Sequence, residues 1–226
     1  NFAHLIETYG HVPNGNRVYY LSRSQPPFFA LMVELCGTHF GPGIIKEFLP
    51  ALRKEYNFWS DQQDGSRRRC IPIKKPLSQD GGPNNRPAGI ALEGVLNRYW
   101  DDNPAPREES WHEDFSLARQ MPAAKRAPLC RDIRAACESG WDFTSRWLAD
   151  GKTLLSIQTT QLLPIDLNAL LWNLERKLAE WLPENQAGAI EQFAQKAARR
   201  QTLMQALCWN EHGGFFHDVH LGTLRP

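Results

Sequence analysis

The chain has 226 residues, a formal net charge of +1 and 42% hydrophobic residues, a composition typical of globular proteins with a buried core. Eight tryptophans exclude a disordered chain, the near-neutral charge predicts no nucleic-acid partner, and no apolar run is long enough to span a membrane. Five scattered cysteines form no CxxC pair, so we expect neither a metal site nor a dense disulfide framework.

Helical periodicity dominates the first 60 residues. Residues 1–9 form a short predicted helix, and an apolar helix follows over residues 28–36, after two prolines that suit a helix start. The apolar residues of 44–59 recur close to every 3.6 positions, so a third helix is expected there. Pro50 interrupts this pattern and predicts a kink or a late start.

The middle of the chain has a different character. Residues 60–87 are crowded with Gly, Pro, Asn and basic residues, which predicts a surface excursion. The basic triplet Arg67–Arg69 is either an anion-binding patch or a solvated loop, and the neutral chain favours the loop. We expect a short hairpin within residues 88–99 and irregular structure over residues 100–126.

Helices return in the C-terminal half. They are expected over residues 128–138, 166–182 and 185–208, with Asp166 as the N-cap of the second. No run of alternating β-branched residues predicts a central sheet. The fold class is therefore mainly α, with long functional loops between the helices.

Polar residues cluster between the first two predicted helices. Asn14, Arg23, Ser24 and Gln25 precede a helix start that would fix their backbone, and their side chains can aim several donors at one ligand rich in hydroxyl groups. The alternative is structural, because Asn-Gly is a common turn and Ser24 can cap the next helix.

Two further clusters carry carboxylates beside aromatic residues. Arg107 and Glu109 precede Trp111, which fits either a sugar subsite or a surface ion-pair network. Asp142 lies between Trp141 and Phe143, an environment that would raise the pKa of its carboxyl, as a general acid requires. Asp142 can equally well cap the turn over residues 144–148.

Five segments resemble the α,α-trehalase family of glycoside hydrolases and cover nearly the whole chain. The family-specific segment is PNGNRVYYLSRSQPPFF, residues 13–29. The segments that follow, in order, are FLPALRKEYNFW (48–59), LNRYWDDNPAPREESWHED (96–114), ESGWDFTSRWL (138–148) and LLPIDLNALLWNLE (162–175).

The resemblance implies an (α/α)6 toroid that hydrolyses trehalose to two glucose molecules with inversion and needs no metal or cofactor. Gly140 would contact the sugar through its backbone, and Asp142 would be the general acid. Arg107 and Glu109 match the family's Arg-x-Glu, with Glu108 where proline is usual. The residues implied to bind glucose hydroxyls are Asn14, Arg23, Ser24 and Gln25.

Two family motifs have no counterpart in the chain. These are the early PGGRFxExYxWDxY segment and the late QWDxPxGWPP segment, with the glutamate that supplies the general base. We therefore expect residues 1–226 to be the middle of a trehalase catalytic domain, with only the acid of the catalytic pair and an open apolar edge. The alternatives are a toroid enzyme for another α-glucoside and a non-catalytic sugar-binding helical module. No sequence signal assigns a compartment or an oligomeric state.

Overall fold

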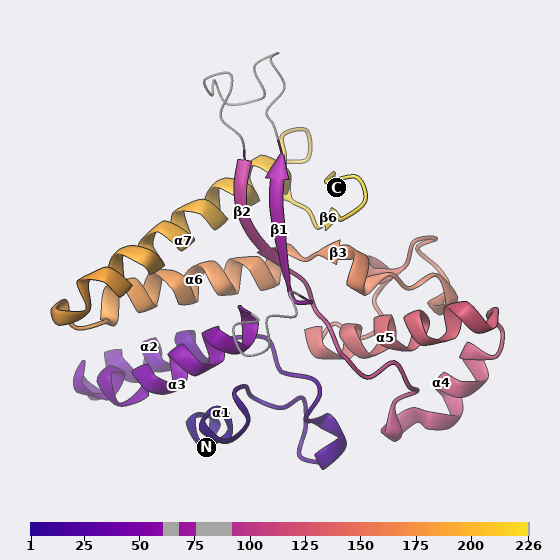
Figure 1. Ribbon diagram of the computed structural model, residues 1–226, viewed down its shortest axis with the longest axis horizontal. Helices are drawn as coiled ribbons and strands as arrows, with labels where there is room; N and C mark the ends of the chain where they lie inside the picture. The colour runs from indigo at the N-terminus through magenta and orange to yellow at the C-terminus, as the bar shows by residue number, and fades with distance from the viewer. Residues whose placement is uncertain (61–67, 76–91, 226) are drawn as a thin grey trace.

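The computed structural model describes residues 1–60, 68–75 and 92–225, and helices dominate them (Figure 1). The longer helices are α1 (Phe2–Tyr9), α2 (Phe29–Phe40), α3 (Gly43–Trp59), α4 (Trp111–Ala118), α5 (Ala123–Ser139), α6 (Ile165–Trp181) and α7 (Ala187–Leu207). Short 3₁₀ helices span Val18–Tyr20, Glu108–Ser110, Ser145–Trp147, Leu154–Ser156, Thr159–Gln161 and Glu184–Gln186. The mainly α prediction is confirmed.

The strands of the described residues form small antiparallel pairs. The longest pair joins β1 (Cys70–Lys75) to β2 (Leu92–Asn97). The shorter pairs join β3 (Leu162–Leu163) to β6 (Val219–His220) and β4 (Trp209–Asn210) to β5 (Phe215–Phe216).

The hairpin predicted within residues 88–99 is therefore wrong. Residues 92–97 pair with residues 70–75, which were predicted to be loop, and both strands bury apolar side chains beside α7. Ile73 and Leu96 supply much of this burial. The rest of the predicted excursion, apart from residues 60, 68 and 69, lies outside the described residues.

Several helix boundaries also differ from the predictions. Helix α3 begins at Gly43 and continues through Pro50, so a late start is wrong; burial of Leu52, Tyr56 and Trp59 stabilises the helix beyond the proline. Helix α6 begins at Ile165, so Asp166 lies in its first turn and is not its N-cap. Helix α4 occupies part of the segment that was predicted to be irregular.

Helix α3 is central to the packing. It lies against α1, α2 and α6, and α6 in turn packs along α7. Figure 1 shows these helices on one side of β1 and β2, with α4 and α5 on the other, and one end of α5 reaches toward the middle of the molecule. The main apolar core joins both sides, because Leu52, Ile133 and Leu171 belong to one buried cluster.

A buried polar network fixes β2 to α6 and α7. The Arg200 guanidinium donates to the Glu175 carboxylate at 2.9 and 3.0 Å, to Asn97 Oδ1 at 2.9 Å and to Asn168 Oδ1 at 2.8 Å. Asn168 Nδ2 also donates to the Asn97 carbonyl at 2.9 Å. The network therefore sets where the chain leaves β2 and enters residues 98–114, which carry predicted site residues.

Helix α2 exposes several large apolar side chains. Leu35 and Phe40 are 70% and 74% exposed, and Leu31 and Met32 are exposed as well. Among the helices of the described residues, none combines the length and the hydropathy needed to cross a membrane.

Candidate active site

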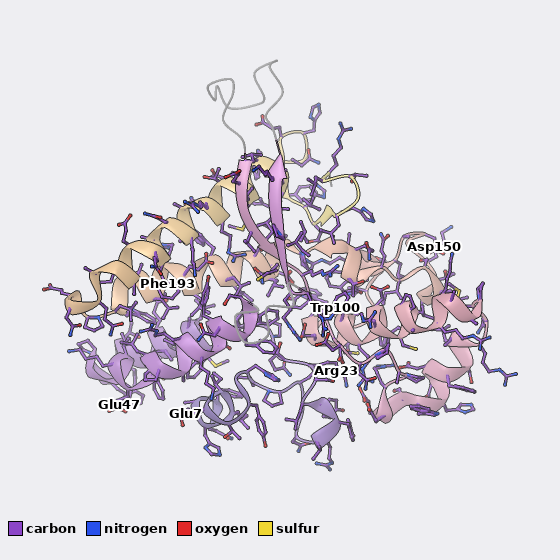
Figure 2. All side chains as sticks on the ribbon, viewed as in Figure 1. Glu7, Arg23, Glu47, Trp100, Asp150 and Phe193 are labelled. Atoms are coloured by element: carbon purple, nitrogen blue, oxygen red, sulfur yellow. The ribbon has the colours of Figure 1, made fainter. Side chains whose placement is uncertain are left out.

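The last turn of α5 is where the predicted site residues meet. Gly140 caps the helix in the left-handed conformation, with φ of 73°, and donates its N–H to the Cys137 carbonyl at 3.2 Å. The same carbonyl accepts from Asn14 Nδ2 at 3.1 Å, and the Cys137 sulfur accepts from Arg107 Nη1 at 3.4 Å. Figure 2 shows Arg23 and Trp100 close to this end of α5.

The electrostatics of the Cys137 thiol show the same convergence. Burial raises its pKa, the positive charges of Arg107 and Arg23 oppose the rise, and the negative charge of Asp142 adds to it. Arg107, Arg23 and Asp142 therefore all lie close enough to Cys137 for their charges to change the pKa of its thiol.

The loop before α2 holds Asn14 and Gln25 side by side. It folds back on itself, because the Asn14 N–H donates to the Arg23 carbonyl at 2.8 Å and the Gln25 N–H donates to the Val12 carbonyl at 2.7 Å. Gln25 Nε2 donates to the Asn14 carbonyl at 2.9 Å. Within the described residues, no donor reaches Asn14 Oδ1 or Gln25 Oε1, so both oxygens are available as acceptors.

Arg23 is fully buried in a cluster of charged side chains. Its Nη2 donates to Glu109 Oε1 at 2.7 Å, and its Nε lies 3.8 Å from Asp101 Oδ2. Asp101 in turn accepts from Arg134 Nε at 2.8 Å. Nε and Nη1 of Arg23 have no hydrogen-bond acceptor in the part of the chain that the structure describes. Buried donors of this kind need water or a ligand as acceptor.

Arg107 and Glu109 do not bind each other. Arg107 makes a two-pronged pair with Asp114, at 2.8 and 2.7 Å, while Glu109 accepts from Arg23. The Arg107 guanidinium also lies 4.8 Å above the centre of the Phe143 ring. The alternative of a surface ion-pair network is wrong for Arg107, because Arg107 and its partner Asp114 are both buried. Glu108 and Glu109 are exposed, and they pair with the buried Arg134 and Arg23.

Asp142 is exposed, so the expected burial between Trp141, Phe143 and Trp147 is wrong. Trp141 and Phe143 are themselves 58% and 40% exposed. Only Trp147 is buried, and its ring contacts Tyr99. These neighbours in sequence do not enclose Asp142, because Phe143 lies under Arg107 and Trp147 packs against Tyr99, while Trp141 is largely exposed.

The turn that carries Asp142 is nevertheless well held. Ser139 Oγ accepts from the Trp141 N–H at 2.9 Å, and the Trp141 carbonyl accepts from the Trp147 indole N–H at 3.3 Å. The cap of the following 3₁₀ turn is Thr144, whose Oγ1 accepts from the Arg146 N–H at 3.3 Å. The interpretation of Asp142 as that cap is therefore wrong.

Glu138 is the residue that sequence reasoning missed. Its buried carboxylate accepts from the Ser24 N–H and Oγ, from Arg69 Nη2 and from the Trp100 N–H, at 2.9 to 3.1 Å. The alternative in which Ser24 caps α2 is wrong, because its hydroxyl bonds Glu138. The available signal was a carboxylate in the last turn of a helix, where the helix dipole disfavours negative charge unless it is compensated.

The basic triplet has a structural role at two of its positions. Arg69 is buried and pairs with Glu138 at 3.1 Å, while the exposed Arg68 forms an ion pair with Asp102. Arg67 lies outside the described residues. The solvated-loop interpretation is therefore wrong for Arg69.

A pocket of about 510 Å³ opens beside the loop before α2. Asn14 and Gln25 line it together with Phe28 and with Glu55 of α3. Glu55 is buried, and no described residue donates to its Oε2. Among the described residues, no group of three His, Cys, Asp or Glu side chains is placed to hold a metal ion.

A comparison with protein families decides the classification. The family model described as Trehalase matches residues 1–224. The chain belongs to the trehalase family. Its sequence is 46% identical over 227 residues to the periplasmic trehalase of Xanthomonas campestris pv. campestris, covering 99% of this chain and 37% of that protein. It is 43% identical to the periplasmic trehalase of Pseudomonas aeruginosa, covering 100% and 39%.

The fold agrees with the family. The neutral trehalase of Saccharomyces cerevisiae superimposes with a TM-score of 0.73 at 23% sequence identity, over 99% of this chain and 42% of the yeast chain. The predicted (α/α)6 toroid is thereby confirmed as the fold to which these helices belong. The chain spans less than half the length of the trehalases it matches.

The buried Glu55 predicts a pH dependence of stability. Burial raises the pKa of its carboxyl from 4.5 to about 8, so between these values the folded chain keeps a proton that the unfolded chain releases. Below pH 4.5 both states are protonated at Glu55 and the free energy of unfolding is not reduced. As the pH rises toward 8, the unfolded chain gains stability by releasing this proton, so the free energy of unfolding falls. Burial lowers the pKa of His11 from 6.5 to about 4, so below pH 6.5 the unfolded chain binds a proton that the folded chain does not. The free energy of unfolding therefore falls as the pH drops below 6.5.

We therefore expect the free energy of unfolding to fall by about 2 kcal/mol more in the wild type than in Glu55→Gln between pH 6.5 and 8. Urea denaturation at the two pH values measures this difference. Glu47→Gln, which changes an exposed glutamate of the same helix, should behave as the wild type. Parallel behaviour of Glu55→Gln and the wild type would show that Glu55 is already ionised at pH 6.5.

Proposed function

We propose that this chain is the part of a trehalase that binds a glucose unit and supplies the general acid. The reaction is hydrolysis of α,α-trehalose to two glucose molecules with inversion. The family match over residues 1–224 is the observation that carries the proposal. The meeting of Asn14, Arg107 and Gly140 at one helix end supports it.

Asp142 is proposed as the general acid. The water oxygen bonds to the anomeric carbon as the glycosidic bond breaks, and Asp142 gives its proton to the departing oxygen. The exposure of Asp142 supports this role because a ligand can reach the carboxyl. A carboxylate from the part of a longer trehalase outside this region would take the proton of the water.

The sugar-binding residues are proposed to act in three ways. Asn14 Oδ1 and Gln25 Oε1 accept hydrogen bonds from sugar hydroxyls, since the amide nitrogen of Asn14 already donates to the Cys137 carbonyl and that of Gln25 to the Asn14 carbonyl. Arg23 and Glu109 act as an ion pair beside the ring, where Arg23 still has donors without an acceptor among the described residues. Ser24 acts indirectly, by holding its loop against Glu138.

The stereochemistry and the substrate can be tested together. A trehalase that contains this chain should release one α-glucose and one β-glucose per trehalose, because inversion affects only the ring that receives water. Proton NMR at early times, before the anomers equilibrate, measures the ratio. Release of α-glucose alone would contradict inversion, and a preference for maltose would favour an enzyme for another α-glucoside.

Asp142→Asn tests the general acid. The substitution is nearly isosteric, so trehalose affinity should persist while kcat for trehalose falls by about 10²–10⁴-fold. Hydrolysis of α-D-glucosyl fluoride should fall much less, because fluoride leaves without needing a proton from the enzyme. Steady-state kinetics with both substrates measures the difference.

Asp150→Asn is the matched control. Asp150 is an exposed carboxylate in the same connection between α5 and α6, and it accepts hydrogen bonds from the Lys152 and Thr153 N–H groups and from the Ser156 hydroxyl. Its replacement should leave both rates near those of the wild type. Normal trehalose turnover by Asp142→Asn would remove Asp142 from the mechanism. Trehalose binding without turnover in the wild-type protein would favour a non-catalytic sugar-binding module.

A further inference from the structure

Glu138 joins three segments of the chain that are distant in sequence. Oε1 accepts from the Ser24 N–H at 3.0 Å, from Ser24 Oγ at 3.1 Å and from Arg69 Nη2 at 3.1 Å, and Oε2 accepts from the Trp100 N–H at 2.9 Å. The side chain has no exposed surface. One carboxylate therefore holds the loop before α2, the start of β1 and the segment after β2 against the end of α5.

The protein holds this charge in an unfavourable place. A carboxylate loses its hydration when it is buried, and the C-terminal end of a helix is the negative end of its dipole. The Arg69 cation and the other donors compensate for both effects. Because the compensation comes from three separate segments, these segments are held in a fixed arrangement around the carboxylate.

The two sides of the proposed active site meet at this point. Ser24 lies between Arg23 and Gln25 in the loop before α2, which we call the sugar-binding loop. Glu138 comes just before Gly140 and Asp142 in the chain. Building on the proposed function, we propose that Glu138 is a positioning residue that sets the sugar-binding loop relative to the general acid Asp142.

A glutamine at position 138 cannot reproduce this arrangement. Its amide has one acceptor oxygen and one NH₂ group, whereas all the groups that face Glu138 are donors. If the oxygen faces Ser24, the NH₂ faces the Trp100 N–H; if the amide is reversed, the NH₂ faces Ser24 and Arg69. Either way one side of the contact is lost, and a shift of about 1 Å in a catalytic site can cost about 10²-fold in rate.

The test is Glu138→Gln in a trehalase that contains this chain. Both kcat values are measured per folded molecule, well below the midpoint of thermal unfolding. We expect kcat for trehalose to fall by about 10²-fold, and to fall at least about tenfold more than kcat for α-D-glucosyl fluoride. The difference arises because only trehalose needs a well-placed acid.

Asp132→Asn is the matched control. Asp132 is a second buried carboxylate of α5, and it accepts from the Thr160 N–H at 2.7 Å rather than from the sugar-binding loop. We expect Asp132→Asn to lower the melting temperature while the ratio of the two kcat values stays that of the wild type. A purely structural role of Glu138 predicts the same result for Glu138→Gln, and that result would overturn the proposal.

Arg69→Gln keeps the test decisive if Glu138→Gln does not fold. This variant removes the positive charge that faces Glu138 but leaves Ser24 and Trp100 as its donors. We therefore expect kcat for trehalose to fall more than kcat for α-D-glucosyl fluoride, with a smaller loss than in Glu138→Gln. Wild-type kinetics of folded Arg69→Gln would then overturn the proposal.

The comparison with Asp142→Asn separates the two hypotheses. One outcome is that Asp142→Asn loses turnover of trehalose but not of α-D-glucosyl fluoride while Glu138→Gln keeps the wild-type ratio of the two kcat values. In that case the positioning role of Glu138 is contradicted and the proposed function is not. If Asp142→Asn hydrolyses trehalose normally, the proposed function fails first.

Discussion

The rest of the proposed site depends on one buried carboxylate. Glu138 has no contact with solvent, and among the described residues it accepts hydrogen bonds from Ser24, Arg69 and Trp100 alone. A charge in this position destabilises the fold unless every donor is in place. The requirement to compensate it therefore decides where the loop before α2 and the segment after β2 must lie, and both carry residues of the proposed site.

Ion pairs with buried arginines lie beside this carboxylate in the neighbouring residues of the same segments. Arg134 holds Asp101, Asp101 lies beside Arg23, and Arg23 binds Glu109. Pairs of this kind contribute little net stability compared with apolar packing, but they fix geometry because removing one partner leaves the other uncompensated. This suits a site that must present hydroxyl-binding groups in a defined arrangement.

The sequence predicted local features better than long-range ones. Helices α3, α6 and α7 follow from apolar periodicity, whereas the pairing of β1 with β2 depends on segments separated along the chain and on their burial beside α7. The convergence of Asn14 and Arg107 was expected from the resemblance alone. The exposure of Asp142 was not, because flanking aromatic residues in sequence need not enclose a side chain in space.

Hydrogen exchange of individual backbone amides tests the central role of Glu138 most directly. The Ser24 and Trp100 amides should exchange slowly in the wild type, because both donate to the buried carboxylate. In Glu138→Gln at least one of them should exchange much faster, while the Ile133 amide inside α5 keeps its protection. Unchanged protection of Ser24 and Trp100 in that variant would contradict the account.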